Sequence, residues 1–158
     1  MHYEHLIQVT DPADPRIEPM DRDALWRGLL ARVYAPERFP FGPDDCRTEA
    51  LDGSTRPEDA TRLRRELHYG ELRLVDEVTI QAGASLRFQP ERREGMPAIV
   101  LSLRIEEPQP GLLCLRFVYA SPAETDDPET DGLRQQAWLA ADRDMVRTLR
   151  TWQAQGRL

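Results

Sequence analysis

The chain has 158 residues, of which 40% are hydrophobic and 31% are charged, and its formal net charge is −7. This composition is typical of a folded protein rather than a disordered one, and the length fits one domain with a single core. An acidic surface opposes binding to nucleic acids and anionic membranes, because both need basic side chains that neutralise phosphates. We therefore expect residues 1–158 to form one domain that binds no nucleic acid.

The sequence offers no signal for export, membrane insertion or metal binding. Residues 1–5 lack the basic and apolar segments of a signal peptide, and no apolar run reaches the roughly 18 residues that span a bilayer. Cys46 and Cys114 are far apart and form neither a CxxC pair nor a cluster with histidine. We therefore expect a cytoplasmic protein with no membrane insertion, no disulfide, no metal ion and no cofactor.

The N-terminal third is predicted to contain a strand and a helix. Alternation of apolar and polar residues up to Val9 predicts the strand, which ends before the proline-rich turn at 11–15. Asp21 is the expected N-cap of the helix, whose apolar face continues to Tyr34. Three prolines between residues 36 and 43 then limit the chain to a short helical turn or a loop, which carries two phenylalanines.

Residues 46–119 follow the two-residue period of strands, with glycine or proline about every ten residues. The predicted strands cover 46–52, 61–69, 72–81, 85–90, 97–107 and 112–120. Because the breaks between them are short, we expect hairpins, and therefore an antiparallel meander rather than a parallel sheet.

The last segment, about Pro128 to Gln155, has the period of a helix, and the acidic run Glu124–Asp131 is expected to be a solvated loop that leads into it. One face of this helix is apolar and comprises Ala137, Trp138, Ala141, Met145, Leu149 and Trp152. A helix of this length would run for about 40 Å, enough to cross a sheet. The predicted fold class is α+β, with a curved antiparallel sheet of six to seven strands wrapped around the long C-terminal helix.

Several local sequences accompany this order of elements. They are Leu25-Trp26-Arg27-Gly28-Leu29, the segment 36–40 around Phe39, Cys46-Arg47-Thr48-Glu49, Arg65-Glu66-Leu67-His68-Tyr69-Gly70, Asp76-Glu77-Val78 and Val146-Arg147-Thr148-Leu149-Arg150. Together they resemble the AtaL-like branch of the START-like (SRPBCC) helix-grip superfamily, small proteins that mostly have no assigned role. The resemblance covers nearly the whole chain but carries over no catalytic motif. It implies a cavity between the sheet and the C-terminal helix, where relatives bind lipids, hormones or polyketides and where some act as cyclases or aromatases.

One charged pair is predicted inside this cavity. If Gly70 and Glu71 form a two-residue hairpin loop, with glycine first in a type II′ turn, Arg65 lies opposite Asp76 on an otherwise apolar face. Pairing would offset the cost of burying either charge. We expect Arg65 to present its guanidinium to a carboxylate or carbonyl of a ligand, with Asp76 holding it in place. An ion pair at the rim, or on the outer face, is the alternative.

The three histidines have no HxH or HxxxH spacing and are not expected to bind a metal ion. His68 falls out of phase with Leu67 and Tyr69, and is therefore expected outside the cavity.

The expected function is binding of a hydrophobic small molecule of lipid-like, aromatic or polyketide-like character. The candidate ligand-binding residues are Arg65, Leu67, Tyr69, Leu74, Asp76, Phe88, Leu101, Leu103, Leu115, Phe117, Trp138, Ala141 and Met145. One alternative is a cyclase- or aromatase-like enzyme without a metal ion, in which Arg65 polarises a carbonyl and Asp76 or Tyr69 moves a proton. The other is a domain without an open cavity that acts as a protein-interaction or dimer module. A homodimer is compatible with each of these hypotheses.

Overall fold

A computed structural model describes residues 1–122 and 127–158, in which seven strands form one antiparallel sheet. The strands are β1 (His2–Thr10), β2 (Asp45–Ala50), β3 (Arg62–Tyr69), β4 (Leu72–Gln81), β5 (Ser85–Pro90), β6 (Val100–Gln109) and β7 (Leu112–Ala120). Their spatial order is β1-β7-β6-β5-β4-β3-β2, so strands β2 to β7 lie beside their neighbours in sequence and β1 completes the sheet next to β7. The predicted meander is confirmed.

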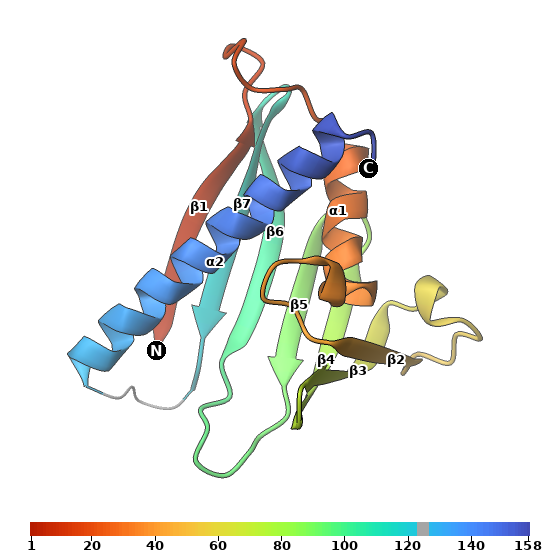
Figure 1. Cartoon of the computed structure of the whole chain (residues 1–158), viewed down its shortest axis with the longest axis vertical. Helices are drawn as coiled ribbons and strands as arrows, with labels where there is room; N and C mark the ends of the chain where they lie inside the picture. Colours follow the sequence, from red (N-terminus) through yellow and green to blue (C-terminus); the bar gives the residue numbers. More distant parts are fainter. Residues whose placement is uncertain (123–126) are drawn as a thin grey trace.

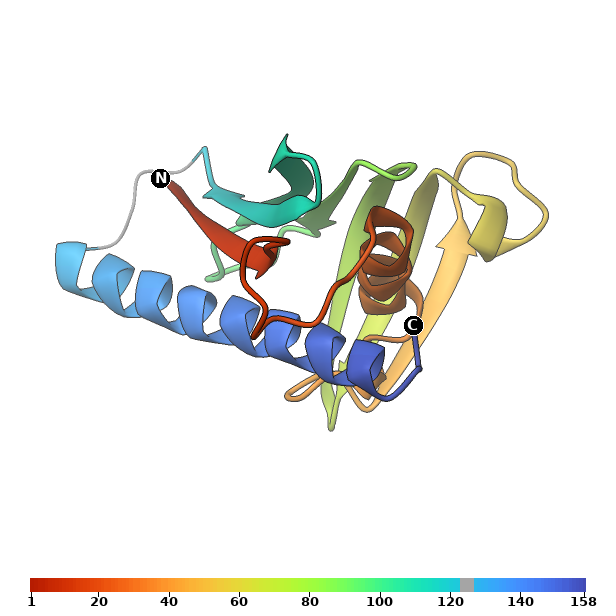
Figure 2. The ribbon, with the colours of Figure 1, turned by 90° about the horizontal axis from the view of Figure 1, so that it is seen from above.

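Two α-helices, α1 (Arg22–Tyr34) and α2 (Pro128–Ala154), lie on the inner face of the curved sheet within the described ranges (Figures 1 and 2). Asp21 caps α1 as predicted, because its side chain accepts a hydrogen bond from the backbone N–H of Ala24 at 2.7 Å. Asp127 caps α2 in the same way, through the N–H groups of Glu129 and Thr130. Residues 124–126 of the expected acidic loop lie outside the described residues. The predicted α+β helix-grip fold is confirmed.

The core fills the space beneath α1 and the C-terminal half of α2. Its fully buried large side chains come from α1 (Leu25, Leu29, Val33), α2 (Leu149) and the sheet (Val9, Leu63, Val78, Leu86, Leu103, Leu113, Leu115, Phe117). Burying a side chain of this size stabilises the fold by about 1.5–3 kcal/mol. Gly28 lets the two helices approach closely, because a Cβ atom at this position would lie 2.7 Å from Cδ2 of Leu149. The core therefore joins both helices to the middle of the sheet.

The inner face of α2 differs from the predicted one. Ala137 and Ala141 are exposed, whereas Asp142 is 1% exposed and faces the sheet beside Met145 and Val146. The predicted face was assembled from apolar residues on the helical period and therefore did not include this carboxylate. Burial of this carboxylate depends on partners from distant parts of the chain, which the helical period does not reveal.

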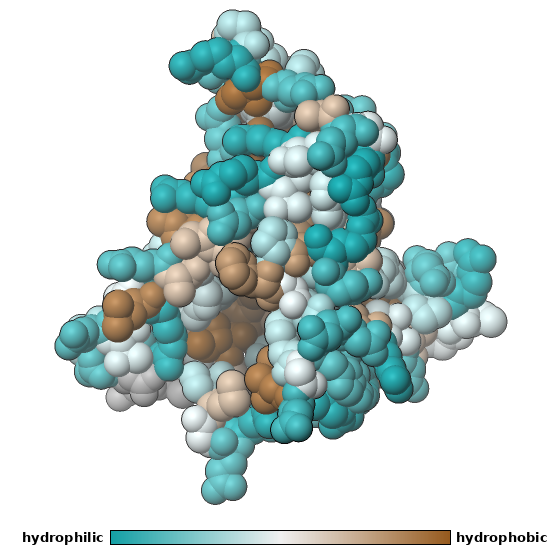
Figure 3. Space-filling view, viewed as in Figure 1, coloured by the Kyte–Doolittle hydropathy of each residue, from teal (hydrophilic) through white to brown (hydrophobic). Residues whose placement is uncertain are grey.

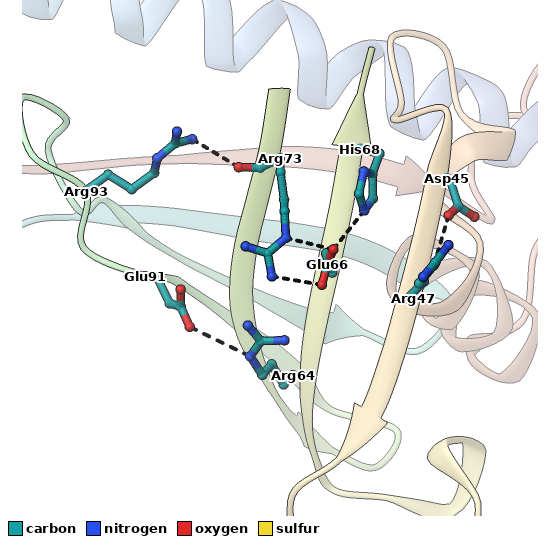
Figure 4. A network of polar contacts seen from close by, with 8 residues as sticks. All are labelled: Asp45, Arg47, Arg64, Glu66, His68, Arg73, Glu91 and Arg93. Atoms are coloured by element: carbon teal, nitrogen blue, oxygen red, sulfur yellow. Dashed lines mark hydrogen bonds and ion pairs between the residues drawn. The ribbon is translucent and has the colours of Figure 1, made fainter. Parts of the chain in front are cut away.

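The outer face of β2, β3 and β4 is polar. Figure 4 shows the polar contacts that cover it, in which Glu66 forms an ion pair with Arg73 at 2.7 Å and a hydrogen bond with His68 at 3.0 Å. Arg64 and Glu91 add a further pair at 3.7 Å. His68 therefore lies outside the inner layer, as predicted. Among residues 1–122 and 127–158, neither helix has the length and apolar character needed to cross a membrane.

Candidate ligand-binding cavity

A cavity of about 310 Å³ lies between the sheet, the two helices and the segment 36–43. Its lining consists of Arg32, Pro36, Phe39, Pro40, Phe41, Gly42, Pro43, Arg65, Leu67, Tyr69, Asp76, Phe88, Leu101, Ala141, Asp144 and Met145. The face seen in Figure 3 is hollowed, and hydrophobic atoms lie inside the hollow. Sites for small molecules begin at about 300 Å³. The cavity is therefore large enough for a small organic molecule.

The structure brings together eight of the candidate residues at this cavity and separates the other five from it. The eight are Arg65, Leu67, Tyr69, Asp76, Phe88, Leu101, Ala141 and Met145; the five are Leu74, Leu103, Leu115, Phe117 and Trp138. Leu103, Leu115 and Phe117 belong to the filled core. The ring of Trp138 stacks on Tyr119, with the ring centroids 4.2 Å apart. Alternation along a strand identifies the inner face, but it does not show where helices fill that face and where they leave it open.

Arg65 and Asp76 occupy the inner face at the cavity, in the register that the hairpin predicted. Gly70 has a φ of +59°, which the first central position of a type II′ turn requires. Arg65 donates from Nε to Oδ1 of Asp76 at 2.9 Å and from Nη2 to Oδ2 at 2.7 Å. Its Nη1 donates to the carbonyl oxygens of Arg32 and Val33, both at 3.0 Å. Four of the five guanidinium N–H groups are thus engaged.

This arrangement ties β3 to the end of α1. The carbonyl groups of the last helical turn have no partner within a helix, and a cation there also interacts favourably with the helix dipole. Arg65 satisfies two of these carbonyls, so it serves the structure of the cavity wall. One of the two belongs to Arg32, whose own side chain lines the cavity.

A second buried polar cluster lies beside the cavity and was not predicted. Oδ2 of Asp142 accepts hydrogen bonds from the hydroxyl of Tyr119 at 2.7 Å and from Nε2 of His5 at 2.9 Å. Burial raises the pKa of the Asp142 carboxyl group and that of the Tyr119 hydroxyl. Within the described residues, the buried Nδ1 atom of His5 has no hydrogen-bond partner. The cluster joins β1, β7 and α2.

Arg32 connects this cluster to the cavity. Its Nη1 atom lies 3.7 Å from Oδ1 of Asp142 and 2.8 Å from the sulfur of Met145. The guanidinium carbon is 5.6 Å from the centre of the Phe88 ring, which the guanidinium of Arg65 also approaches, at 5.0 Å. The side chain of Arg32 keeps 27% of its surface exposed. Sequence reasoning missed this residue because it considered only the apolar face of the helix that continues to Tyr34.

The segment 36–43 forms one wall of the cavity through a tight turn. The N–H of Gly42 donates to the carbonyl oxygen of Phe39 at 3.0 Å, and Phe41 has a φ of +60° between them. A Cβ atom at position 42 would lie 2.1 Å from the carbonyl oxygen of Pro36, so glycine is required there. The side chain of Phe41 is 92% exposed at the cavity. The proline cluster in the sequence marked this loop, but not its position against the sheet.

The cavity offers a cation and hydrogen-bond donors rather than a base. Both carboxylates in the lining are paired with arginine, Asp76 with Arg65 and Asp144 with Arg147. Burial raises the pKa of the Tyr69 hydroxyl, which keeps it protonated at neutral pH. Among residues 1–122 and 127–158, no three His, Cys, Asp or Glu side chains are arranged to hold a metal ion.

Comparison with known proteins identifies relatives by family and by fold. The family model described as acetylaranotin biosynthesis cluster protein L (AtaL) matches residues 7–156. No protein with a curated description matches the chain in sequence.

Similar solved structures share the fold at low sequence identity. An uncharacterised protein from Bacillus thuringiensis has a TM-score of 0.60 and 10% identity, over 94% of this chain and 98% of that one. The Aha1 dimer from Colwellia psychrerythraea has a TM-score of 0.56 and 12% identity, over 96% and 95%. The protein Ara h 8.0201 has a TM-score of 0.53 and 8% identity, over 96% of both chains. At these identities the likeness concerns the fold alone.

Proposed function

The chain belongs to the AtaL family, and from that premise we propose that it binds an apolar small molecule in the cavity between α2, the segment 36–43 and strands β3 to β6. The observation that carries the proposal is an open apolar space in a domain whose remaining inner layer is tightly filled. Among the described residues that line the cavity, four are charged: Arg32, Arg65, Asp76 and Asp144. Ligand sites typically have such a lining, with a few polar groups that set the orientation of the ligand.

The conformation of Phe41 supports the proposal. A non-glycine residue with positive φ costs about 1–2 kcal/mol, and glycine would occupy the same position without strain. The exposed ring of Phe41 also contributes no burial energy to the fold, because its apolar surface stays in water. Strain of this kind is concentrated at ligand-binding positions. We infer that the ring of Phe41 contacts the ligand at the mouth of the cavity.

The alternatives gain less support. The open cavity argues against a domain that acts only through its surface. A cyclase or aromatase would need Asp76 or Tyr69 to move a proton. Both carboxylate oxygens of Asp76 are engaged by Arg65, and the raised pKa of the Tyr69 hydroxyl keeps it protonated and makes it a weaker proton donor. The description of the family as a biosynthesis cluster protein agrees with a small organic ligand.

Calorimetric titration with the neutral bicyclic compound naphthalene-2-carboxamide tests the proposal. Ala141 is exposed and lines the cavity, so the indole of an Ala141→Trp variant would obstruct the cavity without disturbing the core. We expect binding to the unmodified protein with a negative heat-capacity change, and binding on the order of ten-fold weaker in the variant. The control is Ala140→Trp, at an exposed position of α2 that does not line the cavity. Equal binding by all three proteins, or no binding at all, would refute the proposal.

A further inference from the structure

The four charged side chains of the cavity differ in how fully they are paired. Arg65 uses four of its N–H groups in hydrogen bonds, two of them to Asp76, so this pair brings no net charge to the cavity. Asp144 is paired with Arg147 on the next turn of α2. Arg32 differs from these residues. Its contacts among the described side chains are the sulfur of Met145, the ring of Phe88 and, at 3.7 Å, the carboxylate of Asp142.

The pairing between Arg32 and Asp142 is incomplete. Their closest atoms are 3.7 Å apart, beyond hydrogen-bond distance, while Oδ2 of the carboxylate accepts two shorter hydrogen bonds from Tyr119 and His5. A thioether sulfur is only a weak acceptor. Within the described residues, the side chain of Arg32 makes its hydrogen bond through Nη1, which leaves Nε and Nη2 accessible at the cavity.

We propose that Arg32 receives a carboxylate of the ligand, which is therefore an amphipathic acid with an apolar body rather than a purely apolar molecule. The inference rests on the proposed function, since it specifies the ligand class of the same cavity. A guanidinium presents two parallel N–H groups that match the two oxygens of a carboxylate. The apolar body lies among Phe88, Leu101 and Met145.

The volume limits the size of this acid. A protein cavity of about 150 Å³ holds one benzene molecule. The present cavity of about 310 Å³ therefore accommodates an apolar body about the size of two fused rings. Naphthalene-2-carboxylate fits this description, and naphthalene-2-carboxamide has nearly the same shape without the charge.

The test compares the affinities of these two compounds, at pH 7, for four proteins: the unmodified chain, Arg32→Gln, Arg32→Lys and Arg143→Gln. Arg143 is exposed on α2 and does not line the cavity. Arg143→Gln therefore removes one positive charge, as Arg32→Gln does, but at a position outside the cavity. We expect the unmodified chain and Arg143→Gln to bind the carboxylate about ten-fold more tightly than the carboxamide. Arg32→Gln should bind both compounds within two-fold of each other, because it lacks the positive charge that distinguishes the carboxylate from the carboxamide. Arg32→Lys should keep part of the preference, because it retains the charge but not the paired N–H groups.

The outcomes separate this inference from the proposed function. Equal affinities of the unmodified chain for the two compounds would overturn the role of Arg32 and leave the apolar cavity intact as a binding site. A preference that persists in Arg32→Gln would also overturn it. If neither compound binds the unmodified chain, the proposed function fails and the inference fails with it. Circular dichroism and urea unfolding of Arg32→Gln show whether the variant is folded.

Discussion

Arg65 and Asp76 lie opposite each other on β3 and β4, and the guanidinium of Arg65 makes two hydrogen bonds to the carboxylate of Asp76 while it also holds the last turn of α1. Arg65 is 5% exposed and Asp76 is 8% exposed. The pair therefore forms part of the cavity wall, and each charge depends on the other for its solvation.

Substitution of Asp76 should destabilise the protein strongly. Asp76→Asn leaves a buried guanidinium without its counter-charge, and breaking a buried pair in this way costs about 3–5 kcal/mol. The measurement is the free energy of unfolding in urea. The matched control is Glu77→Gln on the same strand, which removes an exposed ion pair with Arg62 and should cost less than about 1 kcal/mol. Similar losses in both variants would show that the buried pair has no special role.

Removal of the Tyr119 hydroxyl should destabilise the protein, because the buried carboxylate of Asp142 loses a hydrogen-bond donor. Tyr119→Phe keeps the stacking on Trp138 but removes a hydrogen bond of 2.7 Å to a carboxylate that is 1% exposed. We expect a loss of about 1–3 kcal/mol in the free energy of unfolding. Tyr3→Phe is the control, because Tyr3 stacks on the same tryptophan and its hydroxyl makes no hydrogen bond within the described residues. An equally large loss of unfolding free energy in Tyr3→Phe would contradict the view that the hydrogen bond from Tyr119 to Asp142 stabilises the fold.

Acid should destabilise the protein through carboxylates on its surface. Hydrogen bonds from Arg73 lower the pKa of Glu66 to about 2, and those from Arg116 and Arg104 lower the pKa of Glu106 to about 2, from a usual value of 4.5. The folded state therefore binds fewer protons than the unfolded state between these values, so the stabilisation is present above pH 4.5 and is lost as the pH falls to about 2. The measurement is urea unfolding at several pH values. Between pH 4.5 and about 2, the free energy of unfolding should fall less steeply in the double variant Glu66→Gln, Glu106→Gln than in the unmodified protein. An unchanged slope would assign acid sensitivity to other groups.

Replacement of Phe41 by glycine should separate stability from binding. Glycine at a φ of +60° removes strain and exposed apolar surface, so the free energy of unfolding should stay within about 1 kcal/mol of the original value. Affinity for naphthalene-2-carboxamide should fall several-fold, because the ring at the mouth is lost. Calorimetry and urea unfolding of the same samples measure both quantities. Lower stability with unchanged affinity would mean that Phe41 serves the fold alone.

The sequence predicted the fold and one charged pair because both follow from local rules. Two-residue alternation, short breaks and the Gly70-Glu71 turn fix the register of a hairpin, and this register places Arg65 opposite Asp76. The N-cap at Asp21 also follows from residues close to one another in the chain. Local pattern and tertiary structure agree at these positions.

The remainder of the site depends on contacts between distant segments. Asp142 is buried because Tyr119, His5 and Arg32, which come from other elements, surround its carboxylate. The sequence pattern of α2 does not predict these contacts. Similarly, alternation placed Phe117 and Leu101 on the same inner layer, but only the packing of the helices shows that Leu101 borders the cavity while Phe117 lies in the core.

The methionine methyl groups provide the most direct test of ligand binding in the cavity. The chain has four methionines, of which Met145 is 5% exposed and lines the cavity, while Met20 and Met96 lie elsewhere. In protein labelled with ¹³C at these methyl groups, titration with naphthalene-2-carboxamide should shift the NMR signal of Met145 through the ring current of the ligand and leave those of Met20 and Met96 in place. Met→Leu variants assign the signals. A stationary Met145 signal at saturating ligand, or a shift confined to Met96, would contradict binding in this cavity.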